Sequence, residues 1–502
     1  MDEQIILYQE LQKVLPGITD RDTLDMAAQQ MTLVENSHPE LLSPSKFFLQ
    51  YLPTDHEASF HICVIGYDTH FLFHACELLY KKTSVYWIPD IGSYLTENDE
   101  VFDFILFSAE TVEYLLEHYD IVRVLEKKTR KDGCWVSEIP PNISNEKMYD
   151  FCVKNGMRIA QLDSEGYFIA QKVTLCHVPV DVFSKYKTVY VVCPQCIKTG
   201  GPELLHQLVY WINTFSGNAR VAYYVKDESL CLCHPELASY VAGHICRYDE
   251  IEDSPENAIV IPEGWPRLAT ENRRAVQYFW WLSVDNYFCC MDDANDAYDT
   301  LSKIDKQTYL HLFQSEYAKD FLLKNRIKKE KLIHLGDYIN QAYLDNTKEA
   351  LKQKKEDIVL YNPKKGKEFV EHLKERAPDL NWKAIEKMTT TEVGELMRKA
   401  KVYIDFGNHP GKDRIPREAA ISGCIVITGR QGSAAYDEDV PIPSQYKIDE
   451  NAGEEVYEKV ISAIREAISN YDSEIQEFES YRAHILAEKE EFLDDLKHIF
   501  FE

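Results

Sequence analysis

Short apolar runs alternate with amphipathic stretches along the chain from His61 onward. Runs rich in β-branched and aromatic residues are typical of buried strands, and their alternation with helical patterns indicates parallel sheets covered by helices. The alternation occurs in three consecutive blocks, so we predict an α/β protein of three Rossmann-like domains. Residues 1–55 carry Pro16, Gly17 and Pro53 as punctuation and no recognisable chemistry, and we interpret them as an N-terminal extension.

The first block, residues 56–175, has the pattern of a complete α/β domain that ends in a hairpin. Its apolar runs have the length and the residue types of strands, and the segments between them have helical periodicity. We expect strands at 61–66, 84–88, 102–107 and 131–138, helices at 110–125 and 145–155, and a hairpin around 163–166.

The second block, residues 185–340, opens with a strand at 188–192 and a loop that ends in Gly200 and Gly201. We predict that a helix begins at Pro202, because the first helical turn leaves its N–H groups without intrahelical partners and proline has none. The glycines would let the loop turn tightly, and the helix N-terminus could then face an anion or a sugar hydroxyl. Further strands are expected at 220–225, 258–262 and 277–282, and a helical segment at 315–322 leads into the run 331–335.

The third block covers residues 341–475 and is followed by a closing helical segment at 476–502. Its apolar runs predict a buried parallel sheet, and the charge runs of the closing helices are interpreted as solvated faces. We expect strands at 357–361, 402–406 and 424–428, a helix at 416–422, and long charged helices from about 454 to 501.

Composition agrees with globular packing and limits the classes of function. Of the 502 residues, 45% are hydrophobic and 12% are aromatic, which a disordered chain would not carry. The formal net charge of −28 argues against a general nucleic-acid binder, because such proteins hold phosphate backbones with an excess of Lys and Arg. Any phosphate site must therefore be a local basic pocket.

The sequence also bears on location. No window approaches the roughly 18 apolar residues that span a bilayer, and the N-terminus lacks the basic start of a signal peptide. The 13 cysteines lie mostly inside apolar patterns, which suits a reducing cytosol. We expect a cytoplasmic protein, and leave open both a peripheral association with the inner face of the membrane and homo-oligomerisation.

A basic loop follows the first strand of the third block. It reads Asn362-Pro363-Lys364-Lys365-Gly366-Lys367. Ammonium groups between a strand end and a helix N-terminus form a plausible clamp for a diphosphate, since both the charges and the backbone donors favour negative charge. The alternative is a solvated turn with ordinary surface lysines.

A second polar loop, residues 407–415, leads into the predicted helix of the same block. We expect Pro416 near the start of this helix and Glu418 in its first turn. Gly423 is expected to end the helix before an apolar strand. A carboxylate at this position could accept hydrogen bonds from two adjacent hydroxyls at once.

From these residues the chain resembles GT-B-fold glycosyltransferases, in particular the large retaining superfamily with a repeated glutamate followed by Ala, a small residue, Gly and a strand. The resemblance covers about residues 185–500 and implies that the last two domains form a GT-B fold with a nucleotide-sugar donor site. Glu418 matches the glutamate that holds the ribose, and the closing helices match the segment that crosses back to the first half. The other donor-binding positions that it implies are Gly200, Gly201, Asn362, Lys364, Lys365, Arg414, Gly432 and Ser433.

The chain departs from that family at one position. Eight residues before Glu418 the family has a glutamate that contacts the sugar, whereas this chain has Pro410, with His409 and Asp413 as the nearest polar candidates. The resemblance implies a metal-independent reaction in which Lys364 and Lys365 stabilise the nucleotide diphosphate leaving group. No cofactor is expected besides the nucleotide-sugar co-substrate.

The first block resembles the class I methyltransferase fold, through its strand order, a Lys-x-Gly turn and the terminal hairpin. Members of that fold bind S-adenosylmethionine at a glycine-rich turn, but here Gly66 is followed by bulky residues. We therefore favour a structural or recognition domain without the cofactor. Asp68, Asp90 and Ser108 are the ligand positions if the domain binds it.

The cysteines leave two minor alternatives. Cys193 and Cys196 follow a strand as the redox pair of glutaredoxin-like proteins does, although residues 197–201 intervene before the helix. Cys231, Cys233 and His234 are zinc-ligand types in an unfamiliar spacing.

The leading hypothesis is a glycosyltransferase that transfers a sugar to a glycan, a lipid-linked saccharide or a protein. A catalytically silent scaffold and an S-adenosylmethionine-dependent methyltransferase remain the alternatives.

Overall fold

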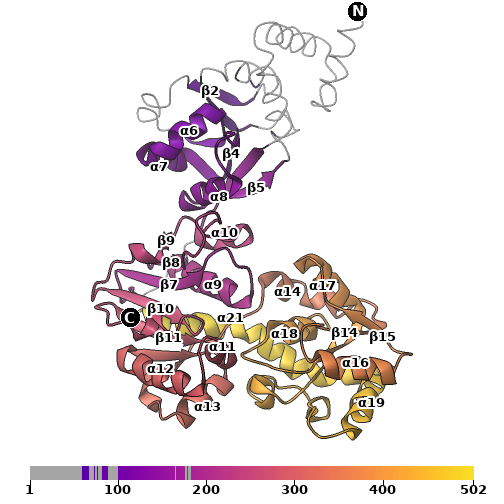
Figure 1. Ribbon diagram of the computed structural model, residues 1–502. Helices are drawn as coiled ribbons and strands as arrows, with labels where there is room; N and C mark the ends of the chain where they lie inside the picture. The colour runs from indigo at the N-terminus through magenta and orange to yellow at the C-terminus, as the bar shows by residue number, and fades with distance from the viewer. Residues whose placement is uncertain are drawn as a thin grey trace, which may run out of the picture. The chain divides into compact units, whose positions relative to one another are not determined.

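The computed structural model describes residues 52, 59–66, 73, 76, 82–88, 100–163, 166–175, 178 and 182–502 (Figure 1). The predicted N-terminal extension therefore lies outside the described residues, except for the buried Leu52. The chain divides into two compact units. The first contains residues 1–178, 194–214 and 220–251, and the second contains residues 179–193, 215–219 and 252–502.

The first sheet has the strand order β2-β1-β3-β4-β6-β5. Its β1, β2, β3 and β4 pair in parallel, and β6 is antiparallel to both β4 and β5. The expected terminal hairpin is present. The elements are β1 (His61–Ile65), β2 (Ser84–Ile88), β3 (Phe102–Phe107), α6 (Ala109–Glu117), α7 (Tyr119–Lys128), β4 (Thr129–Glu138), α8 (Asn145–Lys154), β5 (Met157–Leu162) and β6 (Tyr167–Lys172).

One helix of this domain differs from the prediction. The segment 110–125, expected as a single helix, forms α6 and α7 with a break at His118, whose φ of −125° and ψ of 72° are not helical. The His118 side chain explains the break locally, because its Nδ1 lies 2.7 Å from the Tyr114 carbonyl oxygen and so competes with the backbone. Hydrophobic periodicity continues through such a break and does not reveal it.

The second sheet has the order β13-β12-β11-β10-β7-β8-β9. The neighbouring pairs from β13 to β7, and the pair β8 and β9, are parallel. The strands and longer helices are β7 (Thr188–Pro194), α9 (Gly200–Thr214), β8 (Ala219–Tyr224), α10 (Ala238–Val241), β9 (Ile245–Arg247), β10 (Asn257–Pro262), β11 (Val276–Trp281), α11 (Val284–Cys289), α12 (Ala294–Gln307), β12 (Leu310–Phe313), α13 (Glu316–Lys324) and β13 (Leu332–His334).

The third sheet is wholly parallel in the order β15-β14-β16-β17, with α17 packed on β14 and β16. Its strands have buried apolar centres such as Ile358–Tyr361, which suits a sheet covered on both faces. The elements are α14 (Gln341–Asp345), α15 (Thr347–Ala350), β14 (Glu356–Tyr361), α16 (Lys367–Arg376), β15 (Asn381–Ala384), α17 (Thr390–Lys399), β16 (Ala400–Asp405), α18 (Arg414–Ile421), β17 (Ile425–Thr428), α19 (Glu455–Ser469), α20 (Tyr471–Glu474) and α21 (Glu479–Phe500).

Helix α21 returns from the third sheet to the part of the second unit that carries the strands of the second sheet. The ring of Phe500 packs against Tyr278 of β11, and Phe501 forms an antiparallel bridge with Ser184. The end of α21 therefore contacts β11 and the segment before β7.

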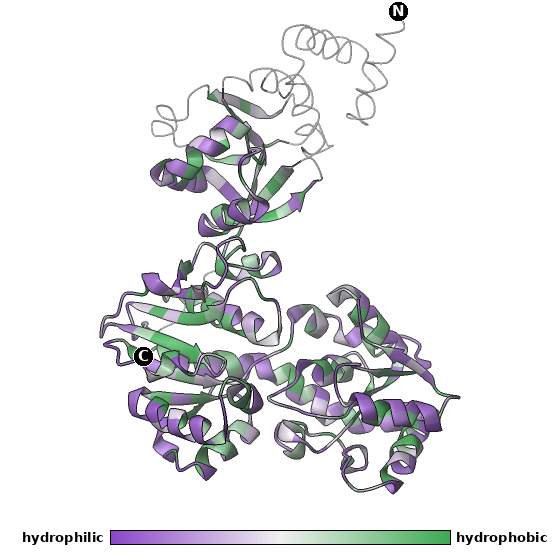
Figure 2. Ribbon diagram, viewed as in Figure 1, coloured by the Kyte–Doolittle hydropathy of each residue, from purple (hydrophilic) through white to green (hydrophobic). Residues whose placement is uncertain are grey.

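Hydrophobic residues are concentrated on the strands, whereas outer helices such as α16 consist largely of hydrophilic residues (Figure 2). The fully buried side chains include Trp135 of β4 and Trp280 and Trp281 of β11.

The parallel sheets and their covering helices confirm the prediction of an α/β protein with Rossmann-like domains. Among the described residues, no helix is both long and apolar enough to span a lipid bilayer.

Candidate functional site

The candidate site lies where β14 and β16 end at the same edge of the third sheet. Residues 362–366 connect β14 to α16, and residues 406–413 connect β16 to α18. Because both strands are parallel, their carboxyl ends meet, and ligands of open α/β sheets bind at such an edge. The two polar loops singled out in the sequence therefore lie side by side.

Lys365 is the centre of a buried charge cluster at this edge. Its Nζ lies 2.6 Å from Oδ2 of Asp413 and 3.2 Å from Oδ1 of Asp405. His409 joins the same cluster, since its Nδ1 lies 2.9 Å from Oδ2 of Asp413 and its Nε2 lies 3.2 Å from the carbonyl oxygen of Asp405. The structure thus brings together Lys365, His409 and Asp413, and adds Asp405.

The electrostatics favour the charged forms of Lys365, His409 and Asp413. Burial disfavours the ammonium of Lys365, but Asp405 and Asp413 outweigh it and raise the pKa of Lys365. Burial likewise opposes the charge of His409, while Asp413 raises its pKa above the ordinary value. The pKa of Asp413 is lowered, because His409 and Lys365 overcome its desolvation.

Asp405 was missed as a site residue in the sequence. It is 1% exposed, and burial raises its pKa, so the charge of Lys365 is what compensates this carboxylate. The signal was available: Asp405 is the last residue of an otherwise apolar parallel strand and directly precedes a polar loop. A charged group in that position is rarely buried without a partner.

Asp413 has a position that would suit a helix cap but is used differently. It stands at the N-cap of α18, yet its side chain makes no capping hydrogen bond, because the carboxylate faces Lys365 and His409. The helix begins at Arg414, two residues before the predicted Pro416. Glu418 is consequently the fifth residue of the helix and not in its first turn.

Glu418 lies within electrostatic reach of the cluster. Burial chiefly raises the pKa of the Tyr403 hydroxyl, and Asp405, Asp413 and Glu418 raise it further. Tyr403 and Asp405 are two residues apart on β16 and so lie on the same face of the sheet. Glu418 and the two aspartates therefore act on the same buried hydroxyl.

The polar loop before α18 is held in place by hydrogen bonds from Ser433, in the turn that follows β17. Ser433 donates its backbone N–H to the His409 carbonyl oxygen at 2.9 Å and its hydroxyl to the Gly411 carbonyl oxygen at 2.6 Å. Gly432 has a φ of +53°, and a Cβ there would overlap the His409 carbonyl oxygen. Ser433 is fully buried, so both residues position the loop.

Pro410, where the sequence resemblance would place a glutamate, has a packing role. The Pro410 carbonyl oxygen accepts the Val284 backbone N–H at 2.9 Å, at the start of α11. Gly411 lies so close to Leu282 that a Cβ would overlap its carbonyl oxygen. Both contacts lie within the second unit and tie the loop to the end of β11.

The two lysines of the predicted clamp have different environments. The Asn362 side chain accepts the Lys364 backbone N–H at 3.0 Å and so forms the turn after β14. The side chain of Lys364 is exposed, whereas that of Lys365 is 18% exposed and directed to the two aspartates.

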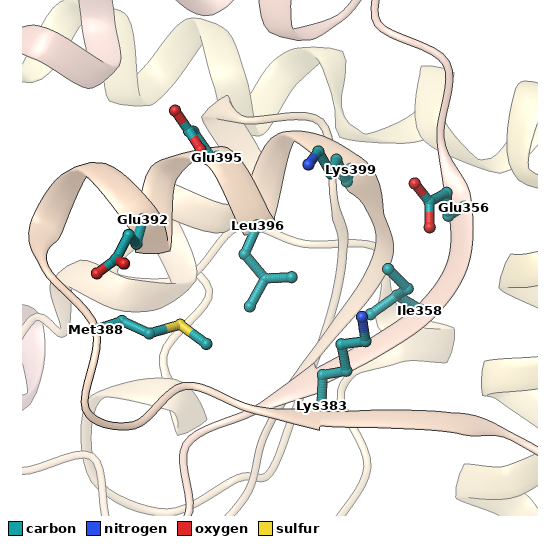
Figure 3. Close-up of a pocket in the computed structure, with 8 residues that line it drawn as sticks. All are labelled: Glu356, Ile358, Lys383, Met388, Glu392, Glu395, Leu396 and Lys399. Atoms are coloured by element: carbon teal, nitrogen blue, oxygen red, sulfur yellow. The ribbon is translucent and has the colours of Figure 1, made fainter.

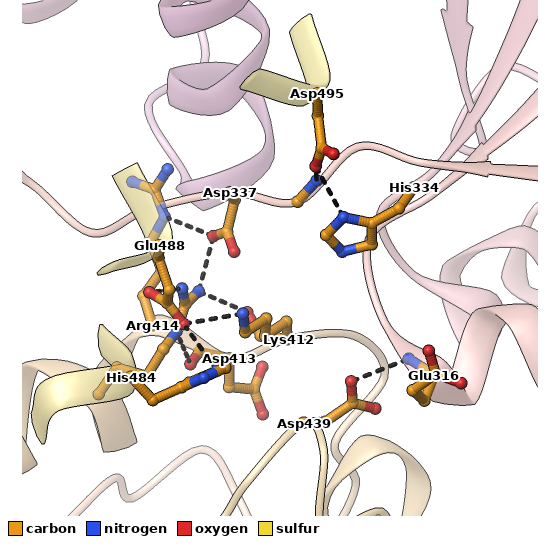
Figure 4. A network of polar contacts seen from close by, with 12 residues as sticks. Glu316, His334, Asp337, Lys412, Asp413, Arg414, Asp439, His484, Glu488 and Asp495 are labelled. Carbon is orange, nitrogen blue, oxygen red and sulfur yellow. Dashed lines mark hydrogen bonds and ion pairs between the residues drawn. The ribbon is translucent and has the colours of Figure 1, made fainter. Parts of the chain in front are cut away.

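A second buried network surrounds Arg417 of α18. Its guanidinium reaches Oδ2 of Asp337 at 2.6 Å and Oε2 of Glu488 at 2.7 Å. Lys412 also pairs with Glu488 at 2.8 Å (Figure 4). Asp337 and Glu488 raise the pKa of Arg417 against its burial. Arg414, a predicted donor ligand, lies 3.9 Å from Asp337 and so borders this network.

Asp439 links the third domain to α13. Its two carboxylate oxygens accept the backbone N–H groups of Glu316 and Tyr317 at 2.8 and 3.1 Å (Figure 4). A carboxylate is favoured there because the first N–H groups of a helix lack intrahelical partners.

Asp405, His409 and Asp413 offer one ligand atom each within 4.8 Å of one another, so they could hold a metal ion. The chemistry of this donor set, two carboxylates and an imidazole, suits a divalent cation. Lys365 already supplies a positive charge to both carboxylates, and a metal ion would have to displace its ammonium group.

The remaining predicted residues lie elsewhere. Gly200 and Gly201 are the first two residues of α9, which begins before the predicted Pro202, and they belong to the first unit. Ser108 caps α6 by accepting the Thr111 backbone N–H at 3.3 Å. Asp68 and Asp90 lie outside the described residues.

A pocket of about 280 Å³ lies along α17, beside strands β14 and β15 (Figure 3). None of its lining residues belongs to the candidate site. Its lining residues are Glu356, Ile358, Lys383, Met388, Glu392, Glu395, Leu396 and Lys399.

No protein-family model matches the sequence, and neither does any curated protein. Solved structures resemble parts of the chain. The sucrose-phosphate synthase of Thermosynechococcus elongatus is 11% identical over 62% of this chain and 98% of its own, with a TM-score of 0.48. WaaG, a glycosyltransferase of lipopolysaccharide biosynthesis, is 12% identical over 62% of this chain and 99% of its own, with a TM-score of 0.40.

A mutant of TarM from S. aureus, in complex with fondaparinux, α-GlcNAc-glycerol and UDP, is also similar. It is 16% identical over 50% of this chain, with a TM-score of 0.37, and the match spans 56% of the TarM chain. These likenesses are distant, and the function proposed below depends on this chain's own residues.

Proposed function

We propose that the chain is a glycosyltransferase with a GT-B fold that uses a nucleotide-sugar donor. The observation that carries the proposal is the convergence of Lys365, His409 and Asp413 at the carboxyl edge of a parallel sheet, beside the start of α18. Such an edge combines fixed charges with the backbone donors of a helix N-terminus, which suits a phosphate-bearing ligand.

In this proposal the exposed ammonium of Lys364 contacts the donor diphosphate, and Glu418 accepts hydrogen bonds from the ribose hydroxyls. His409 and Asp413 face the sugar. Lys365 acts mainly by fixing Asp405 and Asp413, and its positive charge favours the negative charge that develops on the leaving diphosphate.

The finer features extend the proposal. The reaction retains the anomeric configuration and needs no metal. The acceptor is a glycan, a lipid-linked saccharide or a protein in surface polysaccharide or glycoconjugate synthesis. The first domain, whose hairpin order supports a methyltransferase-like ancestry, recognises the acceptor or a partner.

One observation favours a second candidate, a catalytically silent scaffold that still binds nucleotides. The residue that replaces the family's sugar-contacting glutamate, Pro410, has a packing role, and Lys365 is engaged by two carboxylates. A scaffold would keep nucleotide affinity and lack turnover.

The test is calorimetric titration with UDP, GDP, ADP and dTDP, followed by donor-hydrolysis assays with the matching nucleotide-sugars. We expect Glu418→Gln to weaken binding of the preferred nucleotide by tenfold or more, because hydrogen bonds to a charged group contribute about 1.5–3 kcal/mol each. Glu375→Gln, an exposed residue of α16, is the matched control and should bind normally.

The outcomes separate the candidates. Nucleotide affinity with release of nucleoside diphosphate from a donor supports the transferase. Affinity without turnover supports the scaffold, and equal affinity of Glu418→Gln and the native chain would remove the site assignment.

A further inference from the structure

Two thiols from separate segments meet in the first unit. Cys196 lies in the loop after β7, and Cys231 lies in the segment after β8, 35 residues further along. Their Sγ atoms are 3.0 Å apart. Since a disulfide requires about 2.05 Å, a movement of roughly 1 Å would join them.

The backbone around the two thiols is held in place. The Cys196 N–H donates to the Leu232 carbonyl oxygen at 2.8 Å, so the segments run side by side at this point. The Gln195 side chain donates to the carbonyl oxygens of Asp227 and Leu230 and accepts the N–H groups of Lys226 and Asp227. The backbone segments that carry the two thiols are therefore held next to each other.

The two thiols differ in accessibility. Cys196 is half-buried, whereas Cys231 is 4% exposed and burial raises its pKa. Because the thiolate is the reactive form, an oxidant from solution meets Cys196 first and Cys231 acts as the resolving thiol.

This geometry changes both cysteine hypotheses. The sequence left a Cys193–Cys196 redox pair as a minor alternative, but Cys193 is fully buried in β7 and the thiol next to Cys196 is that of Cys231. For zinc, Cys233 Sγ lies 3.7 Å from His206 Nε2, yet within the described ranges a three-ligand group with metal-binding spacing occurs at Asp405, His409 and Asp413 and not here.

We propose that Cys196 and Cys231 form a reversible disulfide and are a modification site for peroxide. The Cys196 thiolate attacks one oxygen of hydrogen peroxide, which breaks the O–O bond and gives Cys196 sulfenic acid and hydroxide. The Cys231 sulfur then displaces the sulfenic oxygen, which leaves as water. Overall, two thiols lose two electrons and two protons, and one peroxide becomes two waters. A small dithiol reverses the reaction.

The crosslink would stiffen the route from β7 to α9, the helix that begins at Gly200. It would also reach the first sheet's domain, because the Leu232 N–H donates to Asp150 of α8 at 2.6 Å. Transient disulfides of this kind are the usual form in reducing compartments. The proposal does not depend on the glycosyltransferase assignment.

The test treats the full chain with a graded excess of hydrogen peroxide, blocks the remaining thiols and maps linked peptides by tandem mass spectrometry. We expect a Cys196–Cys231 crosslink at the lowest effective dose, removed by dithiothreitol. Cys196→Ser and Cys231→Ser should each abolish it, and Cys231→Ser should instead trap Cys196 as a sulfenic acid that dimedone labels.

The matched control carries Cys289→Ser and Cys290→Ser, which remove two exposed cysteines. This control should form the Cys196–Cys231 crosslink as the native chain does. The experiment on the native chain is by itself able to overturn the proposal. The proposal fails if peroxide oxidises Cys289 or Cys290 while Cys196 and Cys231 stay reduced. Crosslinking of Cys196 to a different cysteine would also overturn it.

Discussion

The charge cluster at the end of β16 permits a quantitative prediction for Lys365→Met. The substitution keeps the length of the side chain and removes its charge, leaving Asp405 and Asp413 with His409 as the nearby cation. We expect the free energy of unfolding of the second unit to fall and the predicted donor turnover to fall with it.

The magnitude follows from the two ion pairs. At an effective dielectric constant of about 20, unit charges at 2.6 and 3.2 Å attract each other by roughly 6 and 5 kcal/mol. Desolvation of the ammonium and the carboxylates offsets most of this gain. The loss on removing one partner of a buried pair is therefore about 3–5 kcal/mol.

The assay is urea denaturation followed by tryptophan fluorescence, with Lys367→Met of the neighbouring exposed lysine as the control. The double variant Lys365→Met/Asp405→Asn should recover part of the loss, because it also removes the buried carboxylate charge of Asp405 that the single substitution leaves without its ammonium partner. The single variant should also gain stability from Mn²⁺, since Asp405, His409 and Asp413 can then share a cation. A Lys365→Met variant within about 0.5 kcal/mol of the native chain would refute this account of the cluster.

Three further predictions test other parts of the second unit. Burial raises the pKa of Glu263 from 4.5 to about 7, so the native state holds a proton that the unfolded chain releases. Stability should fall by about 3 kcal/mol as the pH rises from 4.5 to above 7, and Glu263→Gln should flatten that slope in urea titrations at several pH values. Arg417→Met should cost about 3–5 kcal/mol in the same assay by leaving Asp337 and Glu488 unpaired. Gly432→Ala should weaken nucleotide binding in calorimetry and cost about 1–3 kcal/mol, because it combines a positive φ with overlap on His409.

Periodicity predicted most of the strands, because buried parallel strands read as continuous apolar runs, but it missed the short strands β9, β12 and β15. The strand 102–107 was predicted with its observed bounds, and 357–361 differs from β14 by one residue. Helix starts were less accurate. α9 begins at Gly200, where glycines suggested a loop, because a helix can include glycine in its first turn without losing an internal hydrogen bond.

The candidate site was only partly predictable for a physical reason. Lys365, His409 and Asp413 were proposed from their loops, and the structure brings these side chains together. The sequence could not show which of Lys364 and Lys365 would be buried. The direction of each side chain depends on the backbone conformation of the turn, and the sequence pattern does not specify that conformation. The Cys196–Cys231 contact joins distant segments, and local patterns carry no information on such pairs.

The ion network of Arg417 has a mechanical consequence for the second unit. Arg417 precedes Glu418 in α18 and pairs with Asp337 in the connector and with Glu488 of α21, so its ion pairs tie three segments of the second unit together. A rearrangement that kept these ion pairs and separated the third sheet's loops from α11 and α13 would have to break the Pro410 hydrogen bond to Val284 and the two hydrogen bonds that Asp439 accepts from α13.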